Sequence, residues 1–115
     1  MKIKHLKSSK EFAGVLDRGK RIRGKALTLY CKQIPGQDFK VGLIISKKTA
    51  SLATKRNYIR RLIYSDLQTQ EGSLSPGQEI VVRVTKEIGS LTKNDIAHEI
   101  RTDLETLLEK AGIKQ

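Results

Sequence analysis

The chain has 115 residues, of which 37% are hydrophobic, so it holds enough apolar material for one compact core but not for two. It carries 23 Lys and Arg against 12 Asp and Glu, and the resulting net charge of +11 favours polyanionic partners. No apolar run approaches the roughly 18 residues of a membrane span, and the basic residues 1–10 lead into no signal-peptide core. We therefore predict a single domain over residues 1–115, located in the cytoplasm and without a membrane partner.

The positive charge is concentrated in the earlier part of the chain. Residues 1–25 carry nine basic and two acidic side chains (+7), residues 26–69 carry eight and two (+6), and residues 70–115 carry six and eight (−2). This distribution favours a localised binding surface, and a merely solvated basic face is the alternative.

The first expected element is a helix over residues 9–18. Ser8 and Glu11 have the spacing of a capping box, in which each side chain accepts a hydrogen bond from an otherwise unpaired backbone N–H. An apolar stripe at i, i+3 and i+4 begins at Phe12, and Gly19 supplies a stop.

Alternating apolar residues indicate two strands, over residues 25–32 and 39–45, separated by a turn at residues 35–38. We expect these two strands to form an antiparallel hairpin. A short additional strand also fits residues 20–24. Cys31, the one cysteine, cannot form an internal disulfide and is expected to be a small buried thiol.

A second helix is predicted over residues 52–68, with a core-facing sector formed by Leu52, Ile59, Leu62 and Ile63. A loop at residues 72–77 precedes a strand at residues 80–84, and a final apolar helix follows a cap at residues 92–95. This order of elements predicts an α+β sandwich of a small sheet and packed helices. The second helix joins parallel neighbouring strands, and general rules predict a right-handed crossover.

The candidate binding residues are cations before and within the second helix. Arg56 and Arg60 share one helical row, with Asn57 and Arg61 in the row beside it. Guanidinium groups suit phosphates because several donors lie in one plane and the charge is permanent. Asn57 can bond a base edge or a ribose hydroxyl, or simply the local backbone. The full candidate set is Lys47, Lys48, Lys55, Arg56, Asn57, Arg60 and Arg61.

Two aromatic residues, Phe12 and Tyr30, are candidates for stacking on an unpaired base, and core packing is the alternative for each. The sequence offers no glycine-rich phosphate loop, no zinc-ligand spacing and no pair of carboxylates placed to hold a catalytic metal. His5 and His98 are expected at the surface. We therefore predict no catalytic and no metal-binding residue in the protein.

A longer pattern joins the run Val41-Gly42-Leu43-Ile44-Ile45-Ser46-Lys47-Lys48, after seven residues, to the run Arg56-Asn57-Tyr58-Ile59-Arg60-Arg61-Leu62. This pattern resembles the protein component of bacterial ribonuclease P, and weaker matches extend the resemblance over nearly the whole chain. The resemblance implies an αβββαβα-type sandwich similar to a ribosomal protein domain. It also implies a left-handed crossover around the Arg-rich helix, contrary to the general rule.

The resemblance further implies a division of labour. A catalytic RNA hydrolyses the 5′ leader from precursor tRNA with bound Mg2+, while the protein assists substrate and metal binding. The seven candidate residues from Lys47 to Arg61 match the region that meets the catalytic RNA. Phe12 and Tyr30 match aromatic positions of a groove that holds the leader. The implied partners are the catalytic RNA and precursor tRNA, with no obligatory protein partner.

Three residues depart from the family pattern. Tyr58 and Tyr64 stand where the family commonly has basic residues, so a phosphate contact is either weakened or replaced by stacking. Leu16 stands where a further aromatic is often found, so the leader contacts are expected to differ. The alternative functions are a ribosomal or other structural RNA-binding protein and a self-sufficient metal nuclease, and the second lacks support from paired carboxylates.

Overall fold

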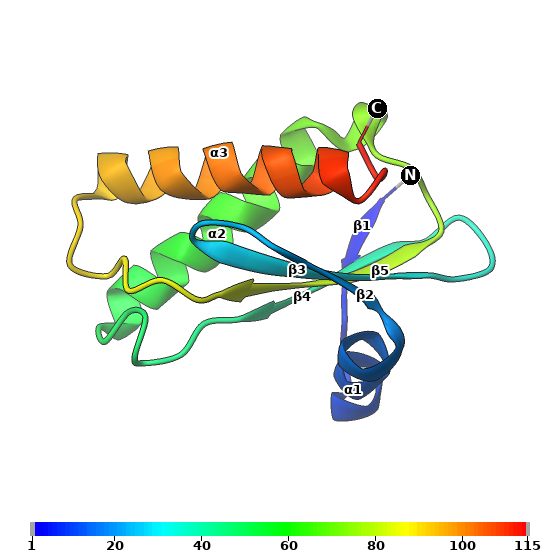
Figure 1. Cartoon of the computed structure of the whole chain (residues 1–115), viewed down its shortest axis with the longest axis horizontal. Helices are drawn as coiled ribbons and strands as arrows, with labels where there is room; N and C mark the ends of the chain where they lie inside the picture. The colour runs from blue at the N-terminus through cyan, green and yellow to red at the C-terminus, as the bar shows by residue number, and fades with distance from the viewer. Residues whose placement is uncertain (1, 115) are drawn as a thin grey trace.

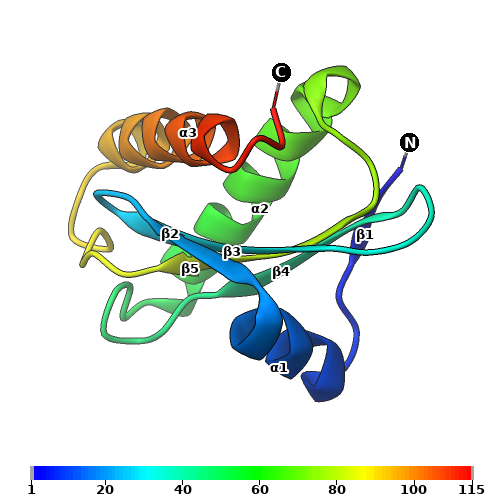
Figure 2. The same ribbon diagram turned by 45° about the vertical axis from the view of Figure 1, so that its right-hand side comes forward.

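The structure, a computed structural model that describes residues 2–114, contains a five-stranded mixed sheet with helices on both faces (Figure 1). In chain order the elements are β1 (Ile3–His5), α1 (Ser9–Arg18), β2 (Lys20–Arg23), β3 (Leu27–Gln33), β4 (Phe39–Ile44), α2 (Ala53–Thr69), the 3-10 helix η1 (Glu71–Ser73), β5 (Gln78–Val84) and α3 (Lys93–Lys110). The strand order is β1-β4-β5-β3-β2. Helices α2 and α3 cover one face of the sheet and α1 lies on the other (Figure 2). The predicted α+β sandwich is confirmed.

The predicted helix caps are present at α1 and α3. The Ser8 hydroxyl accepts a hydrogen bond from the Glu11 N–H at 3.1 Å, and the Glu11 carboxylate accepts one from the Ser8 N–H at 3.3 Å. At α3 the Thr92 hydroxyl accepts one from the Asp95 N–H. The prediction for Leu52 is wrong, because α2 begins only after this residue, and Leu52 is 59% exposed at the N-cap.

The predicted hairpin between β3 and β4 is wrong, because β5 lies between these two strands. It pairs antiparallel with β3 and parallel with β4. The loop that joins β3 to β4 is hydrogen-bonded to Gly77 at both of its ends. The Ile34 N–H donates to the Gly77 carbonyl, and the Gly77 N–H donates to the Asp38 carbonyl, both at 2.9 Å. Gly77 has a φ of +74°, which favours glycine. Strand β5 buries apolar side chains on both faces, Ile80, Val82 and Val84 on one and Val81 on the other, and such a strand gains most from a central position.

The β4–α2–β5 connection joins parallel neighbours, as predicted, but its hand differs from the general rule. In Figures 1 and 2, with α2 above the sheet and β4 running towards the loop that precedes α2, β5 lies nearer the viewer than β4. This arrangement is a left-handed crossover. The right-handed expectation is therefore wrong, and the hand implied by the family resemblance is confirmed.

Of the two edge strands, β1 was not predicted and β2 was. Strand β1 pairs parallel with β4, with Ile3 opposite Phe39. Strand β2 pairs antiparallel with β3 and falls within the predicted residues 20–24. The two edges of the sheet are thus short strands, and β2 consists of lysine and arginine except for Ile22.

Two hydrophobic clusters lie on the two faces of the sheet. The larger one fills the space between the sheet and helices α2 and α3, and it includes Cys31, which is 9% exposed and whose thiol pKa is raised by burial. The smaller one lies under α1 and consists of Leu6, Val15 and Val81, with Phe12, Leu16, Tyr30 and Ile44 packed against it. No helix among the described residues is long and apolar enough to span a membrane.

Candidate nucleic-acid interface

Helix α2 presents two of its arginines to solvent. Arg60 and Arg61 are both exposed, and the Arg60 Nη1 donates a hydrogen bond to the Asn57 Oδ1 at 3.2 Å. The Arg61 side chain makes no hydrogen bond or ion pair with another described residue. These two guanidinium groups keep most of their donors available for phosphates.

Lys55 and Arg56 instead bond the protein's own backbone. The Lys55 Nζ donates to the Leu91 carbonyl at 2.7 Å. The Arg56 Nη1 donates to the Ala50 and Ser51 carbonyls, both at 2.8 Å. The Lys55 bond connects α2 to the loop between β5 and α3, and the two Arg56 bonds fix the end of the loop between β4 and α2. Lys47 and Lys48 are exposed on this second loop. A contact of any of these cations with RNA stays a prediction.

The tyrosines that depart from the family pattern fasten α2 to its neighbours. The Tyr58 hydroxyl donates to the Lys93 carbonyl at 3.1 Å, and the Lys93 Nζ lies 5.4 Å from the centre of the Tyr58 ring. The Tyr64 hydroxyl donates to the Val41 carbonyl at 3.2 Å, and its ring lies 4.2 Å from that of His5. Burial raises the pKa of Tyr64, and the charge of Arg60 opposes this effect. Both hydroxyls therefore serve packing within the protein.

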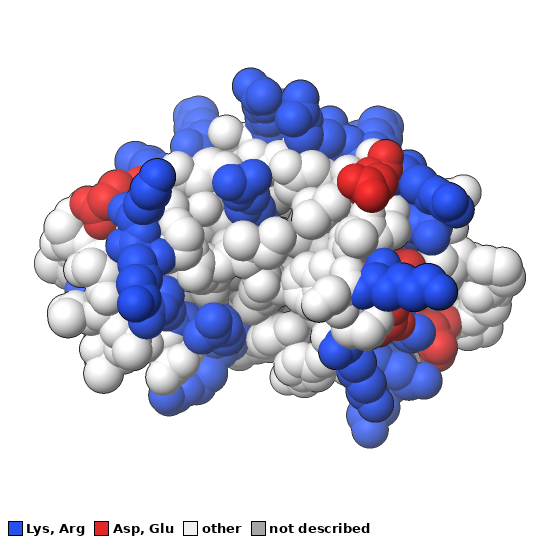
Figure 3. Space-filling view, turned by 90° about the horizontal axis from the view of Figure 1, so that it is seen from below, with Lys and Arg blue, Asp and Glu red and all other residues white. Residues whose placement is uncertain are grey.

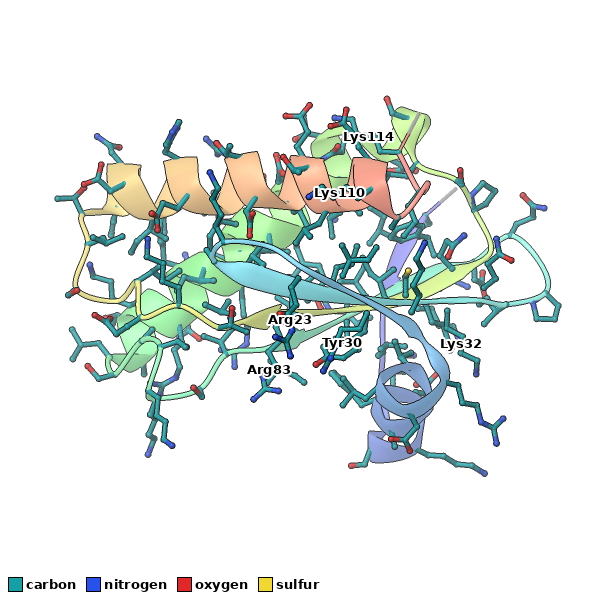
Figure 4. All side chains as sticks on the ribbon, in the orientation of Figure 1. Arg23, Tyr30, Lys32, Arg83, Lys110 and Lys114 are labelled. Atoms are coloured by element: carbon teal, nitrogen blue, oxygen red, sulfur yellow. The ribbon has the colours of Figure 1, made fainter. Side chains whose placement is uncertain are left out.

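On the opposite face of the sheet, α1 leaves part of the surface open. Figure 3 views this face from below, where Lys and Arg side chains surround a largely uncharged central band. A groove of about 360 Å3 lies there, lined by Arg21, Arg23, Gly24, Thr28, Tyr30, Arg83 and Thr85. In Figure 4, Arg23, Tyr30 and Arg83 all lie below the sheet, on the side of α1.

The register of the strands explains why three arginines meet at this groove. Arg21 is opposite Tyr30 on β3, while Arg23 and Arg83 flank Thr28 from either side, so their side chains share one face. All three arginines are exposed, and none of their side chains forms an ion pair or hydrogen bond with another described residue. These arginines were not predicted as site residues. The alternation of Arg21 and Arg23 along a strand was the available signal.

Phe12 and Tyr30, the predicted stacking residues, lie on this same face and both pack partly against the smaller cluster. The Phe12 ring lies on Gly42, where an added Cβ would be 2.5 Å from the ring Cζ. Each ring thus combines partial burial with partial exposure. The structure brings Tyr30 together with the three arginines, whereas Phe12 does not line the groove. Both aromatic residues are separated from α2, which covers the other face (Figure 1).

An ion pair holds α1 against the sheet beside the aromatic residues. The Lys40 Nζ lies 3.2 Å from the Glu11 Oε2, and the pKa of Lys40 is raised chiefly by this hydrogen bond. The pKa of Glu11 is lowered, first by the hydrogen bond from the Lys7 N–H and then by that from Lys40. Glu11 therefore both caps α1 and fastens it to β4.

Within residues 2–114, no three His, Cys, Asp or Glu side chains are grouped so that they could hold a metal ion.

Comparisons with known proteins give a consistent result. The family model Ribonuclease P matches residues 1–112. The ribonuclease P protein component of Halalkalibacterium halodurans is 33% identical over 98 residues, which cover 84% of this chain and 82% of that protein. That of Exiguobacterium sibiricum is 29% identical over 97 residues, covering 84% and 83%.

Solved structures agree on the fold. The structure of the Staphylococcus aureus RNase P protein has a TM-score of 0.84 and 21% identity, and the match covers 99% of this chain and 100% of that one. The RNase P protein from Thermotoga maritima has a TM-score of 0.78 and 19% identity, covering 93% and 96%. At these identities the structures establish the shared fold.

Proposed function

Because the chain belongs to the ribonuclease P protein family, whose members are the protein component of a ribonucleoprotein endonuclease of tRNA processing, we propose that it uses two surfaces for two RNAs. One surface binds the catalytic RNA, and the other binds the 5′ leader of precursor tRNA. The catalytic RNA then carries out hydrolysis. The observation that carries this proposal is the separation of the exposed α2 cations from the groove, on opposite faces of one sheet.

The surface for the catalytic RNA consists of the exposed part of the candidate set. Arg60 and Arg61 lie along α2, and Lys47 and Lys48 lie on the loop before it. Arginine and lysine groups that neutralise phosphates release counterions, which makes binding strong at low salt and independent of sequence. In this arrangement Arg56 holds the end of the loop from which Lys47 and Lys48 reach the RNA, and Lys55 fastens α2 to the loop before α3.

The groove suits a single strand of RNA. A base of an unpaired leader can stack on the exposed part of Tyr30, while Arg21, Arg23 and Arg83 neutralise its phosphates. Phe12, on α1, packs against the same small cluster as Tyr30 and supplies a second ring on this face. Contacts of this kind tolerate different leader sequences, because every base offers a face for stacking.

Magnesium enters this proposal as an ion of the assembled enzyme. Because no ligand set is grouped within the described side chains, we place Mg2+ mainly on the RNA, where it supplies the charge stabilisation that hydrolysis needs. The protein contributes positive charge that offsets repulsion between RNA strands. We also propose that the protein works in the cytoplasm, together with its catalytic RNA and precursor tRNA.

The experiment is cleavage of precursor tRNA by the cognate catalytic RNA at low Mg2+, with and without this protein. Stimulation of a single cut at the mature 5′ end is expected. Tyr30→Ala should weaken binding of leader-bearing tRNA by roughly 1–3 kcal/mol more than binding of mature tRNA, because one stacked base is lost. Tyr30→Phe is the matched control, since it keeps the ring, and it should stay close to wild type.

Two results would contradict the proposal. Tight RNA binding without stimulation of cleavage would favour a structural RNA-binding protein instead. An equal loss with both substrates for Tyr30→Ala would place the leader elsewhere.

A further inference from the structure

The turn between β2 and β3 is held by a buried carboxylate from the other side of the sheet. Asp103 belongs to α3 and is 7% exposed. Its carboxylate accepts hydrogen bonds from the N–H groups of Lys25 at 3.0 Å, Ala26 at 2.9 Å and Leu27 at 2.9 Å. Hydrogen bonds to an ionised group are stronger than neutral ones, so this turn is firmly attached to α3.

The same turn is fixed from the opposite direction by the end of β5. The Ala26 carbonyl accepts hydrogen bonds from the Thr85 N–H at 2.9 Å, the Lys86 N–H at 3.3 Å and the Thr85 hydroxyl at 3.2 Å. The Gly24 N–H donates to the Leu27 carbonyl at 2.7 Å and closes the turn. The turn therefore has bonded neighbours on both sides.

This turn forms one end of the groove. Gly24 and Thr85 line the groove and belong to the fastened region. Arg23 directly precedes Gly24 and is opposite Thr28, another lining residue. The orientation of the turn therefore sets where the β2 arginines stand relative to Tyr30.

Strand β2 has little else to hold it. It is a four-residue edge strand that pairs only with β3, and of its residues only Ile22 packs against the main core. Short edge segments with few apolar contacts open locally at low free-energy cost. We propose that Asp103 is a positioning residue for the leader groove: by holding residues 25–27 it keeps Arg21 and Arg23 in place for the phosphates of a single-stranded RNA. This inference rests on the proposed function of the groove.

The test compares Asp103→Asn with Glu109→Gln. Both substitutions remove one negative charge from α3, but Glu109 is exposed and far from the turn along the helix, so the pair controls for general electrostatic attraction to RNA. Two quantities are measured for each variant: the ratio of affinities for leader-bearing and mature tRNA, and the hydrogen exchange rates of the amides of residues 25–27.

Asp103→Asn turns one acceptor into a donor that faces backbone N–H groups. The affinity ratio is expected to fall by about fivefold, because binding then has to order the arginines first. The exchange of the three amides should accelerate, while amides of β5 keep their protection. Glu109→Gln should leave both quantities at their wild-type values.

A double-mutant cycle with Arg23→Ala makes the test specific. If Asp103 acts through the β2 arginines, the losses in the affinity ratio from Asp103→Asn and Arg23→Ala are less than additive. Additive losses, or a ratio for Asp103→Asn equal to that for Glu109→Gln, would overturn the inference. If Asp103→Asn does not fold, Gly24→Ala takes its place, because a Cβ at residue 24 would overlap the Asp103 carboxylate. The affinity ratio and the cycle with Arg23→Ala are then read in the same way.

Failure of the inference and failure of the proposed function give different results. If the wild type itself does not discriminate leader-bearing from mature tRNA, the groove assignment fails. If the wild type discriminates and Asp103→Asn discriminates equally well, only the role of Asp103 fails.

Discussion

Replacing Arg61 with alanine is expected to weaken binding of the catalytic RNA without affecting the fold. Arg61 is exposed and has no bonded partner within the described chain, so the free energy of unfolding should change by less than about 0.5 kcal/mol. The slope of log K against log salt is negative, and one lost phosphate contact makes it shallower by about 0.7–0.9. Taking the affinities of variant and wild type as equal at about 1 M salt, a slope change of roughly 0.8 makes the affinity of the variant roughly fivefold lower at about 0.15 M salt.

Arg56→Ala is the informative contrast on the same helix. Its guanidinium donates to two backbone carbonyls, one of them on the fully buried Ala50. Losing these bonds is expected to cost about 2 kcal/mol of stability. The measurements are urea unfolding for stability and titration of the catalytic RNA at four or more salt concentrations.

The reasoning is refuted if the two arginines behave in the same way. An Arg61→Ala variant with an unchanged salt slope would mean that this guanidinium meets no phosphate. An Arg56→Ala variant as stable as the wild type would mean that its bonds to the loop carry no net free energy.

Three further predictions concern the region around α1 and the core. The pKa of Glu11 is lowered below its ordinary 4.5, so the contribution of the carboxylate to stability is present above pH 4.5 and lost as the pH falls through the folded-state pKa. The difference in unfolding free energy between the wild type and Glu11→Gln should therefore vanish in acid. A difference that persists at low pH would contradict this. The Cys31 thiol should react with a disulfide reagent at pH 8 only after addition of denaturant, because burial limits access and raises its pKa; fast reaction of the native protein would argue against the packing. Gly42→Ala should cost about 1–3 kcal/mol in urea unfolding, because the new Cβ displaces the Phe12 ring, whereas Gly72→Ala meets no atom within 4 Å and serves as the control.

Local patterns of residues predicted the helices accurately. The Ser8 capping box and the Thr92 cap are both formed, because each depends only on residues a few positions apart. Leu52 shows the limit of periodicity, because the apolar pattern starts at this residue, one position before the first residue of α2.

Pairing between strands was harder to predict, because it depends on competition between distant segments. Short connections usually join paired strands, and the loop at residues 34–38 suggested a hairpin. However, the apolar side chains of β5 point to both faces, with Val81 under α1 and Ile80 and Val82 in the main core. A strand of this kind is stabilised most in the centre, so it separates β3 from β4.

Candidate binding residues could be recognised in the sequence where the signal lay in one segment, but not where it came from several. The α2 cations lie within residues 55–61, and the structure shows further that Lys55 and Arg56 bond the backbone. The groove arginines come from β2 and β5, which are about sixty residues apart and meet only through β3.

The central position of β5 has a consequence for how the chain folds during synthesis. Before residues 78–84 emerge from the ribosome, only two separate two-stranded ribbons can form, β1 with β4 and β2 with β3. Isolated two-stranded ribbons are marginally stable in water. Pairing of β5 with both ribbons closes long loops at once, which slows folding. The sheet therefore forms in one late, cooperative step, and a nascent chain that ends before Gln78 remains largely unfolded.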